Sequence, residues 1–129
     1  MKRLLVIGFL ALAGAAQAQV QTPTSEASGA ILRGLDTMTG ITKDIAINVG
    51  QTETYERLEI TLGDCRYPTG NPATDAFAYL TIRDIREDKP RFEGWMIASS
   101  PALSALDHPR YDVWVLRCKI PVAVPADDG

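Results

Sequence analysis

The sequence predicts an all-β fold: a small antiparallel sandwich or partly open barrel of six to seven strands. Apolar and polar residues alternate with a period of two in several segments of strand length, and turn residues separate these segments. No segment has the apolar period of a long amphipathic helix. The chain has two cysteines, an even number that favours one disulfide in an exported protein. We therefore expect a β-domain with one short helical turn, stapled by one disulfide.

Residues 1–18 have the features of a secretory signal peptide. Lys2 and Arg3 precede an apolar run, residues 4–13, and Ala16–Ala18 forms a small-x-small cleavage site. We expect cleavage after this site and a periplasmic location. The alternative is an uncleaved anchor, but the apolar run is shorter than the roughly 20 residues that a spanning helix needs. No spanning segment is expected after cleavage.

The remainder of the chain is expected to form one domain with short extensions. Residues 19–29 are small and polar and favour a flexible N-terminal arm. Residues 30–120 contain the strand patterns and form the single β domain. Residues 121–129 contain two prolines and are expected to form a C-terminal tail.

The chain is acidic, with 13 Lys and Arg against 16 Asp and Glu and a net charge of −3. Signal cleavage removes two of the cations, which makes the remaining chain more acidic still. Nucleic acids and anionic lipid surfaces are bound through basic faces. The charge balance therefore argues against either as the partner.

Six segments have the alternation expected of strands. In the third of them, Leu58, Ile60 and Leu62 are expected to point inward. In the fourth, Phe77 and Tyr79 share one face, and Ala78, Leu80 and Ile82 share the other. Residues 66–75, with two prolines and a glycine, predict a surface loop. The aromatic side chains are expected mainly in the core, with some forming an interaction patch if one sheet face is uncovered. The strands are Ala30–Asp36, Thr42–Val49, Tyr55–Leu62, Ala76–Arg86, Arg91–Ala98 and Tyr111–Ile120, and the aromatic residues are Phe77, Tyr79, Trp95, Tyr111 and Trp114.

The disulfide is expected to join Cys65, at the end of the third strand, to Cys118 on the last strand. Closing so long a loop lowers the entropy of the unfolded chain and contributes about 4 kcal/mol on the chain-entropy model. The alternative is a pair of free buried thiols. Strict alternation on the last strand places Cys118 on the face of Trp114 and Leu116, opposite Tyr111.

The loop 99–110 separates two strand patterns. A serine followed by Pro101 favours the start of a short helix, Ala102–Leu106, with serine hydroxyls capping its N–H groups. Asp107 and His108 precede a proline, which disfavours the helical conformation and ends the turn.

The same loop offers the residue types of a serine hydrolase. Ser99, Ser100, Ser104, Asp107 and His108 include a hydroxyl, a base and a carboxylate. However, no Gly-x-Ser-x-Gly elbow is present, and adjacent Asp and His residues would have to fold back on each other. A capped turn is the preferred interpretation, and the hydrolase is kept as an alternative.

Other chemistry has weaker support. One histidine and two cysteines that are expected to be oxidised do not make a zinc set. Asp84, Glu87 and Asp88 lack the spacing of a calcium loop and are expected to form a charged hairpin turn. Glu59 and Glu93 could act as a glycosidase pair, but both occupy outward strand positions. No cofactor is expected.

The segment Gly94–Cys118 (GWMIASSPALSALDHPRYDVWVLRC) resembles the signature of an exported Gram-negative bacterial family with a periplasmic domain of unknown function. The resemblance extends over Ala30–Cys118. It implies a single periplasmic domain with a cysteine pair, no established catalytic residues and an accessory role at an inner-membrane complex of respiration or the envelope. The further matching segments are Arg33–Asp36, Thr39-Gly40, Val49–Gln51, Leu58–Ile60, Asp64–Arg66 and Ala76–Ala78.

Taken together, these observations favour a non-enzymatic periplasmic domain that binds a protein partner, with a membrane complex as the candidate partner. The alternatives are an envelope hydrolase that uses the Ser99–His108 loop and a small-ligand carrier, which would need an enclosed apolar cavity. The expected partner-binding loop comprises Ser99, Ser100, Pro101, Leu103, Asp107 and His108.

Overall fold

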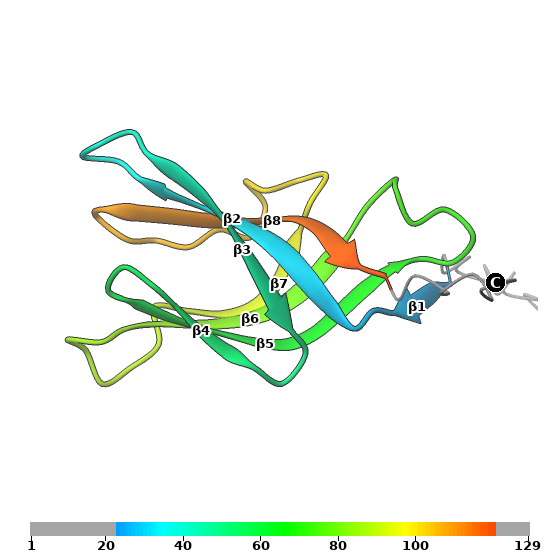
Figure 1. The fold of residues 1–129 in the computed structure, drawn as a ribbon, viewed down its shortest axis with the longest axis horizontal. Helices are drawn as coiled ribbons and strands as arrows, with labels where there is room; N and C mark the ends of the chain where they lie inside the picture. Colours follow the sequence, from blue (N-terminus) through cyan, green and yellow to red (C-terminus); the bar gives the residue numbers. More distant parts are fainter. Residues whose placement is uncertain (1–22, 121–129) are drawn as a thin grey trace, which may run out of the picture.

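The computed structural model describes residues 23–120, which form a sandwich of two antiparallel sheets (Figure 1). The larger sheet has the order β1–β5–β6–β7, with β4 also paired to β5, and the smaller sheet has the order β3–β2–β8. The predicted all-β class is confirmed, in its sandwich form. The predicted signal peptide and C-terminal tail lie outside the described residues. The strands are β1 (Thr24–Glu26), β2 (Gly29–Asp36), β3 (Thr42–Asn48), β4 (Thr52–Tyr55), β5 (Leu58–Pro68), β6 (Phe77–Asp84), β7 (Phe92–Ile97) and β8 (Tyr111–Lys119).

The core lies between the two sheets and follows the predicted alternation. On β5 and β6 every second side chain is buried, because each strand presents one face to the opposing sheet and one to solvent. The smaller sheet contributes inward side chains from all three of its strands. The fully buried aliphatic side chains of this core include Leu32, Ile47, Leu58, Ile60, Leu62, Leu80, Ile82 and Val115.

The sandwich has eight strands rather than six or seven, for two reasons. First, the predicted flexible arm contains β1, whose backbone pairs with the end of β5; the Ser25 hydroxyl also lies 2.7 Å from that of Thr69. Second, the predicted strand Tyr55–Leu62 is split by a tight turn at Glu56, where φ is +49°. The prediction of a flexible arm was therefore wrong for residues 24–26, and the prediction of a single strand over residues 55–62 was also wrong. Both β1 and β4 are stabilised by backbone hydrogen bonds, and the side-chain pattern of the sequence does not indicate where such bonds form.

β5 also continues beyond its predicted end. It runs to Pro68, into the segment predicted as a surface loop, after an irregularity in its pairing with β6 between Leu62 and Asp64. The extra residue is Gly63, and a bulge of this kind lets the strand bend and continue. Only the rest of the predicted loop, beyond Pro68, connects β5 to β6.

The Cys65–Cys118 disulfide is present, with a Cα–Cα distance of 5.9 Å. However, the predicted face of Cys118 was wrong. The pairing of β2 with β8 shifts between Ile31 and Leu32, so Val115 and Arg117 face successive β2 residues and Leu116 is the extra residue. This bulge turns Cys118 into the core, on the same side as Tyr111, and leaves Trp114 on the outer face.

The predicted helix Ala102–Leu106 is absent. A single turn forms instead, closed by the Leu103 N–H donating to the Ser100 carbonyl at 3.1 Å. The following residues, 105–108, have no regular secondary structure; Leu106 and His108, two positions apart, are both buried while Asp107 is exposed. A helix would place Leu106 and His108 on different faces. Residues 23–120 contain no helix, and so none long and apolar enough to cross a membrane.

Candidate functional site

The loop that connects β7 to β8 crosses from the larger sheet to the smaller one and is tied down near both ends. At its start the Ser99 hydroxyl donates to Asp75 Oδ2 at 2.7 Å, and the Ser99 N–H donates to Oδ1 at 3.0 Å. Asp75 lies in the β5–β6 loop and also accepts the N–H of Ala76. The serine therefore joins two loops. The prediction that it caps a helix was wrong.

At the other end of the loop, His108 is fully buried. Its Nδ1 accepts the backbone N–H groups of Arg110 at 3.0 Å and Tyr111 at 3.2 Å. A nitrogen that accepts hydrogen bonds carries no proton, so these contacts assign the proton to Nε2. Nε2 lies 2.9 Å from Asp84 Oδ2 and donates to it. The ring thus connects the start of β8 to the end of β6.

Asp84 is fully buried and accepts hydrogen bonds from two residues. Arg86 donates its backbone N–H at 3.0 Å and two guanidinium N–H groups at 3.2 Å, in addition to the contact from His108. Hydrogen bonds from Arg86 and then from His108 hold the pKa of Asp84 well below its ordinary value. The carboxylate is therefore ionised, and the adjacent Arg86 cation balances its charge.

Tyr111 lies beside His108, and two arginine side chains are close to its ring. Its ring centroid lies 5.1 Å from that of His108, and the guanidinium carbons of Arg57 and Arg110 lie 5.5 Å and 5.4 Å from it. Arg110 in turn donates to Asp36 at the end of β2. We call the set Asp36, Asp84, Arg86, His108, Arg110 and Tyr111 the polar hub. The hub joins both sheets at one end of the sandwich.

These contacts bear on the hydrolase alternative. Both nitrogens of His108 are engaged, by Asp84 and by backbone N–H groups, and Ser99 donates its hydroxyl to Asp75. The serine–histidine pair that the alternative requires is therefore not formed in this structure. His108 was predicted as part of a partner-binding loop. Its side chain lies in the core, where it positions the loop, while Asp107 is exposed.

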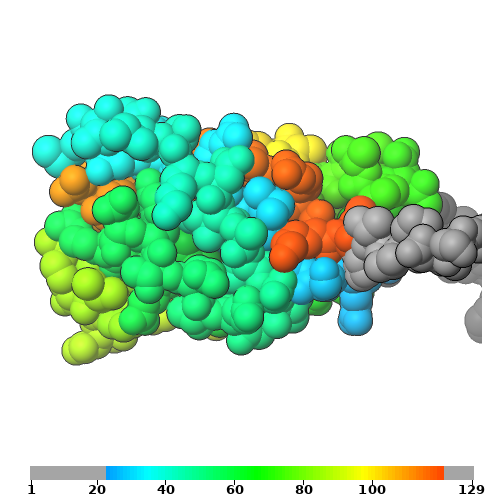
Figure 2. All heavy atoms as spheres, viewed as in Figure 1, coloured from blue at the N-terminus to red at the C-terminus, as the bar shows by residue number. Residues whose placement is uncertain are grey.

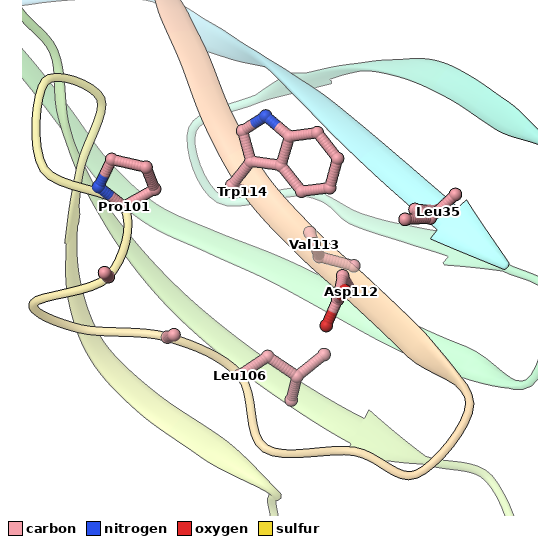
Figure 3. A pocket seen from close by; sticks show the side chains of 8 residues that line it. Leu35, Pro101, Leu106, Asp112, Val113 and Trp114 are labelled. Carbon is pink, nitrogen blue, oxygen red and sulfur yellow. The ribbon is translucent and has the colours of Figure 1, made fainter. Parts of the chain in front are cut away.

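The middle of the loop forms one wall of an apolar groove of about 400 Å³ (Figure 3). Pro101 and Leu106 project from the loop, Trp114 stands on β8, and Leu35 of β2 lies beyond it. Leu103 at the turn is 78 % exposed. The predicted loop and the outer face of β8 thus form one apolar surface. The groove is lined by Leu35, Pro101, Ala102, Ala105, Leu106, Asp112, Val113 and Trp114.

The aromatic residues separate into three groups. Tyr111 is buried, as predicted, and Trp114 lines the groove. Phe77, Tyr79 and Trp95 lie together on the outer face of the larger sheet, where Trp95 is 42 % exposed. The expectation of a core location was wrong for these three, because the smaller sheet covers only the opposite face of the larger one. It was also wrong for Trp114, which lies on the outer face of β8. The alternative of an interaction patch fits their position.

Metal ligands do not gather in the described part of the chain. Residues 23–120 contain no group of three or more His, Cys, Asp or Glu side chains that could hold a metal ion. Of the three carboxylates considered for calcium, Asp84 belongs to the polar hub and Glu87 pairs with Arg91 at 2.7 Å. Glu59 pairs with Arg83 on the outer face of the larger sheet.

Sequence reasoning missed two residues that position the loop. Asp84 continues the inward series of Leu80 and Ile82, and a carboxylate at an inward strand position was a signal that a buried partner exists. Asp75 gave no comparable signal, because an aspartate in a loop with prolines is ordinary.

Comparisons with known proteins identify relatives but no activity. The family described as "Uncharacterized protein conserved in bacteria" (DUF2155) matches residues 30–118, from β2 to the second cysteine. The "Uncharacterized protein RP359" of Rickettsia prowazekii (strain Madrid E) is 26 % identical over 87 residues, which cover 65 % of this chain and 56 % of the relative. The match therefore spans little more than half of that relative's length. No solved structure matches the chain.

Proposed function

Since this chain belongs to the bacterial family DUF2155, whose match covers the sandwich from β2 to Cys118, we propose that it is a non-enzymatic, protein-binding domain of the periplasm. In this proposal it serves as an accessory subunit of an inner-membrane complex. Its binding surface is the groove between the β7–β8 loop and Trp114. The observation that carries the proposal is this groove, because a preformed apolar surface beside an exposed leucine is typical of protein recognition.

The rigidity of the loop supports recognition. Ser99 is bonded to Asp75 at one end, and His108 is buried at the other. The turn that presents Leu103 is therefore constrained before a partner arrives, which lowers the entropy that binding would cost. The volume of about 400 Å³ fits a few apolar side chains of a partner protein.

The proposed location rests on one sequence feature and one bond. The N-terminal 18 residues have the pattern of a cleaved export signal. The Cys65–Cys118 disulfide is of the kind that forms and persists in oxidising compartments.

A crosslinking experiment with matched variants tests the binding surface. Leu103→Asp places a charge at the rim of the groove, whereas Met38→Asp places one on the β2–β3 turn, at a residue that is similarly exposed (78 % and 76 %). Both chains are expressed in the native bacterium with a C-terminal tag, crosslinked in intact cells and purified from membranes. We expect a defined membrane protein to crosslink to the wild type and to Met38→Asp but not to Leu103→Asp.

Two results would overturn the proposal. One is a wild-type chain that is recovered only as a free monomer. The other is a crosslinked partner whose yield is the same for Leu103→Asp as for Met38→Asp, since the groove would then not be the contact surface. Fractionation of the same cells tests the location, because a protein retained in the cytoplasm contradicts it.

A further inference from the structure

The groove beside the β7–β8 loop contains one charged group, the carboxylate of Asp112. The other residues that line the groove are apolar. Figure 3 shows the Asp112 carboxylate turned toward Leu106 of the loop. Asp112 and Trp114 both lie on the outer face of β8, separated by one residue. An acid thus stands beside the aromatic side chain of the groove.

The arginines on the elements that form this groove are each paired with another carboxylate. They lie on β2, just before β7 and just before β8, and none of them is paired with Asp112. Lys43 of β3 lines a separate hollow, together with Tyr55. Within residues 23–120, the Asp112 side chain therefore has no ion pair. The three arginine pairs are Arg33–Asp44 at 2.7 Å, Arg91–Glu87 at 2.7 Å and Arg110–Asp36 at 3.0 Å.

A partner that covers the groove also covers the Asp112 carboxylate. An ionised carboxylate loses its hydration when an interface closes over it, and only an opposite charge or hydrogen-bond donors offset that loss. A lysine or arginine of the partner supplies both. A partner with an apolar or acidic residue at the same place leaves the charge unpaired or repelled. Asp112 therefore discriminates among partners that fit the apolar part of the groove equally well.

The strand geometry fixes how the partner's side chains must be spaced. Residues at alternate positions of a strand, such as Asp112 and Trp114, are about 7 Å apart along it. The partner must present an apolar side chain to Trp114 and a cation to Asp112 at a similar separation. Positions i and i+2 of a strand meet this requirement, as do positions i and i+4 of a helix, which are about 6 Å apart.

We propose that the groove recognises a segment of a partner protein that carries apolar side chains and a Lys or Arg at this spacing. The apolar side chains pack against Trp114 and Leu106, and the cation pairs with Asp112. The chain's net charge of −3 also favours the approach of a basic segment. This inference rests on the proposed function, because it names the chemistry of the partner for the same groove.

Selection from a library of random dodecapeptides displayed on phage tests the pairing. The bait is the protein produced in a bacterial periplasm with its disulfide formed. We expect the wild type to select peptides with an apolar residue and a Lys or Arg at i, i+2 or i, i+4. Asp112→Lys should select peptides in which Asp or Glu replaces the cation. Glu53→Lys is the matched control, since Glu53 is an exposed strand acid on the other sheet, and it should select the wild-type peptides.

The affinity of a selected peptide tests the same contact without a change of shape. Asp112→Asn keeps the size of the side chain but leaves the peptide's cation unpaired, so we expect binding about tenfold weaker or more. Glu53→Gln should bind as the wild type does. Added salt should weaken binding to the wild type more than binding to Asp112→Asn, because salt screens the ion pair.

Three outcomes would overturn the inference: wild-type selection that enriches no peptide family, selected peptides that lack a cation, or equal affinities of the wild type and Asp112→Asn. These outcomes are separate from a failure of the proposed function, which is tested by the crosslinking of Leu103→Asp against Met38→Asp. A membrane protein lost with Leu103→Asp but retained with Asp112→Lys would leave the groove as the contact surface and reject the ion pair.

Discussion

The two sheets are joined at both ends of the sandwich, but by different chemistry. At the end near β1, Cys65 of β5 is bonded covalently to Cys118 of β8. At the other end, the polar hub connects β6 to β8 through His108 and Asp84, and β2 to β8 through Arg110 and Asp36. Figure 1 shows the turns of four hairpins and loops gathered at the hub end. In Figure 2 the β2–β3 turn forms the upper left corner of this end and the β6–β7 turn the lower left.

Because the chemistry differs, the stability that each end contributes is sensitive to a different treatment. A disulfide adds no charge, so its contribution is lost with reductant and not with acid. The hub depends on ionised Asp84 and Asp36, so its contribution is sensitive to acid and not to reductant. The two ends can therefore be broken one at a time, and the changes below run from the largest expected effect to the smallest.

Removing the covalent end should have the largest effect. The cysteines are 53 residues apart, and opening a loop of that length costs about 4 kcal/mol on the chain-entropy model. We expect the free energy of unfolding, measured in urea, to fall by about this amount when both cysteines are replaced by alanine. Wild-type protein in reductant is the control and should behave like the variant. A loss of less than about 1 kcal/mol would mean that the hub end alone holds the sheets together.

Removing the centre of the polar hub should have the next largest effect. His108→Ala leaves the buried Asp84 without one donor and the N–H groups of Arg110 and Tyr111 without their acceptor. We expect a loss of about 3 kcal/mol in the free energy of unfolding, because unpaired buried polar groups keep their desolvation cost. Ser99→Ala, which breaks one tie at the exposed end of the same loop, is the comparison and should cost about 1 kcal/mol. Equal losses would show that the hub is no more than another surface contact.

The covalent end was predictable from the sequence, whereas the hub was not. Two cysteines allow one intramolecular pairing, and the strand patterns placed Cys65 at the end of one predicted strand and Cys118 within another. His108 and Asp84 are 24 residues apart, and nothing local to either reports the other. The short-range signal at His108 was a turn before proline, which was interpreted as the end of a helix.

Alternation predicted the interior well but failed where strands deviate from regular pleating. Burial on one face imposes a period of two, so the inward positions of Leu58, Ile60 and Leu62 were predicted correctly. The bulge at Leu116 reverses the face of every residue after it, and no residue type in that segment requires a bulge. β1 escaped prediction because it is held by backbone pairing, with side chains that bury little.

Crowding the tyrosines beside the polar hub should have a smaller effect. A Cβ at Gly34 would lie 2.5 Å from Cζ of Tyr55, whose ring packs edge-on against Tyr111 at 5.8 Å. We expect Gly34→Ala to lower the free energy of unfolding by about 2 kcal/mol, because the two rings must shift together. Gly94→Ala is the matched strand control, since its Cβ would lie 3.7 Å from the nearest atom, at Phe92. If the two variants unfold at the same urea concentration, a methyl group at Gly34 fits beside Tyr55 without cost, and the expected crowding is contradicted.

Acid should weaken the hub end but not the disulfide, and near neutral pH this is the smallest of the expected effects. The folded-state pKa of Asp84 is lowered by Arg86 and His108, so its stabilisation is full above the ordinary value of 3.8 and is lost as the pH falls from there through the lowered value. We expect the urea midpoint to be level from pH 7 to pH 5 and to decline below pH 4. Asp84→Asn removes one titrating group, so its midpoint should decline less steeply below pH 4, although Asp36 and Asp44, whose pKa values are also lowered, still contribute. The disulfide does not titrate. Protein lacking both cysteines should therefore start from a lower urea midpoint at pH 7 and show the same decline in that midpoint with acid. A steeper decline in the cysteine-free protein would mean that the two ends are coupled through the core and do not act independently.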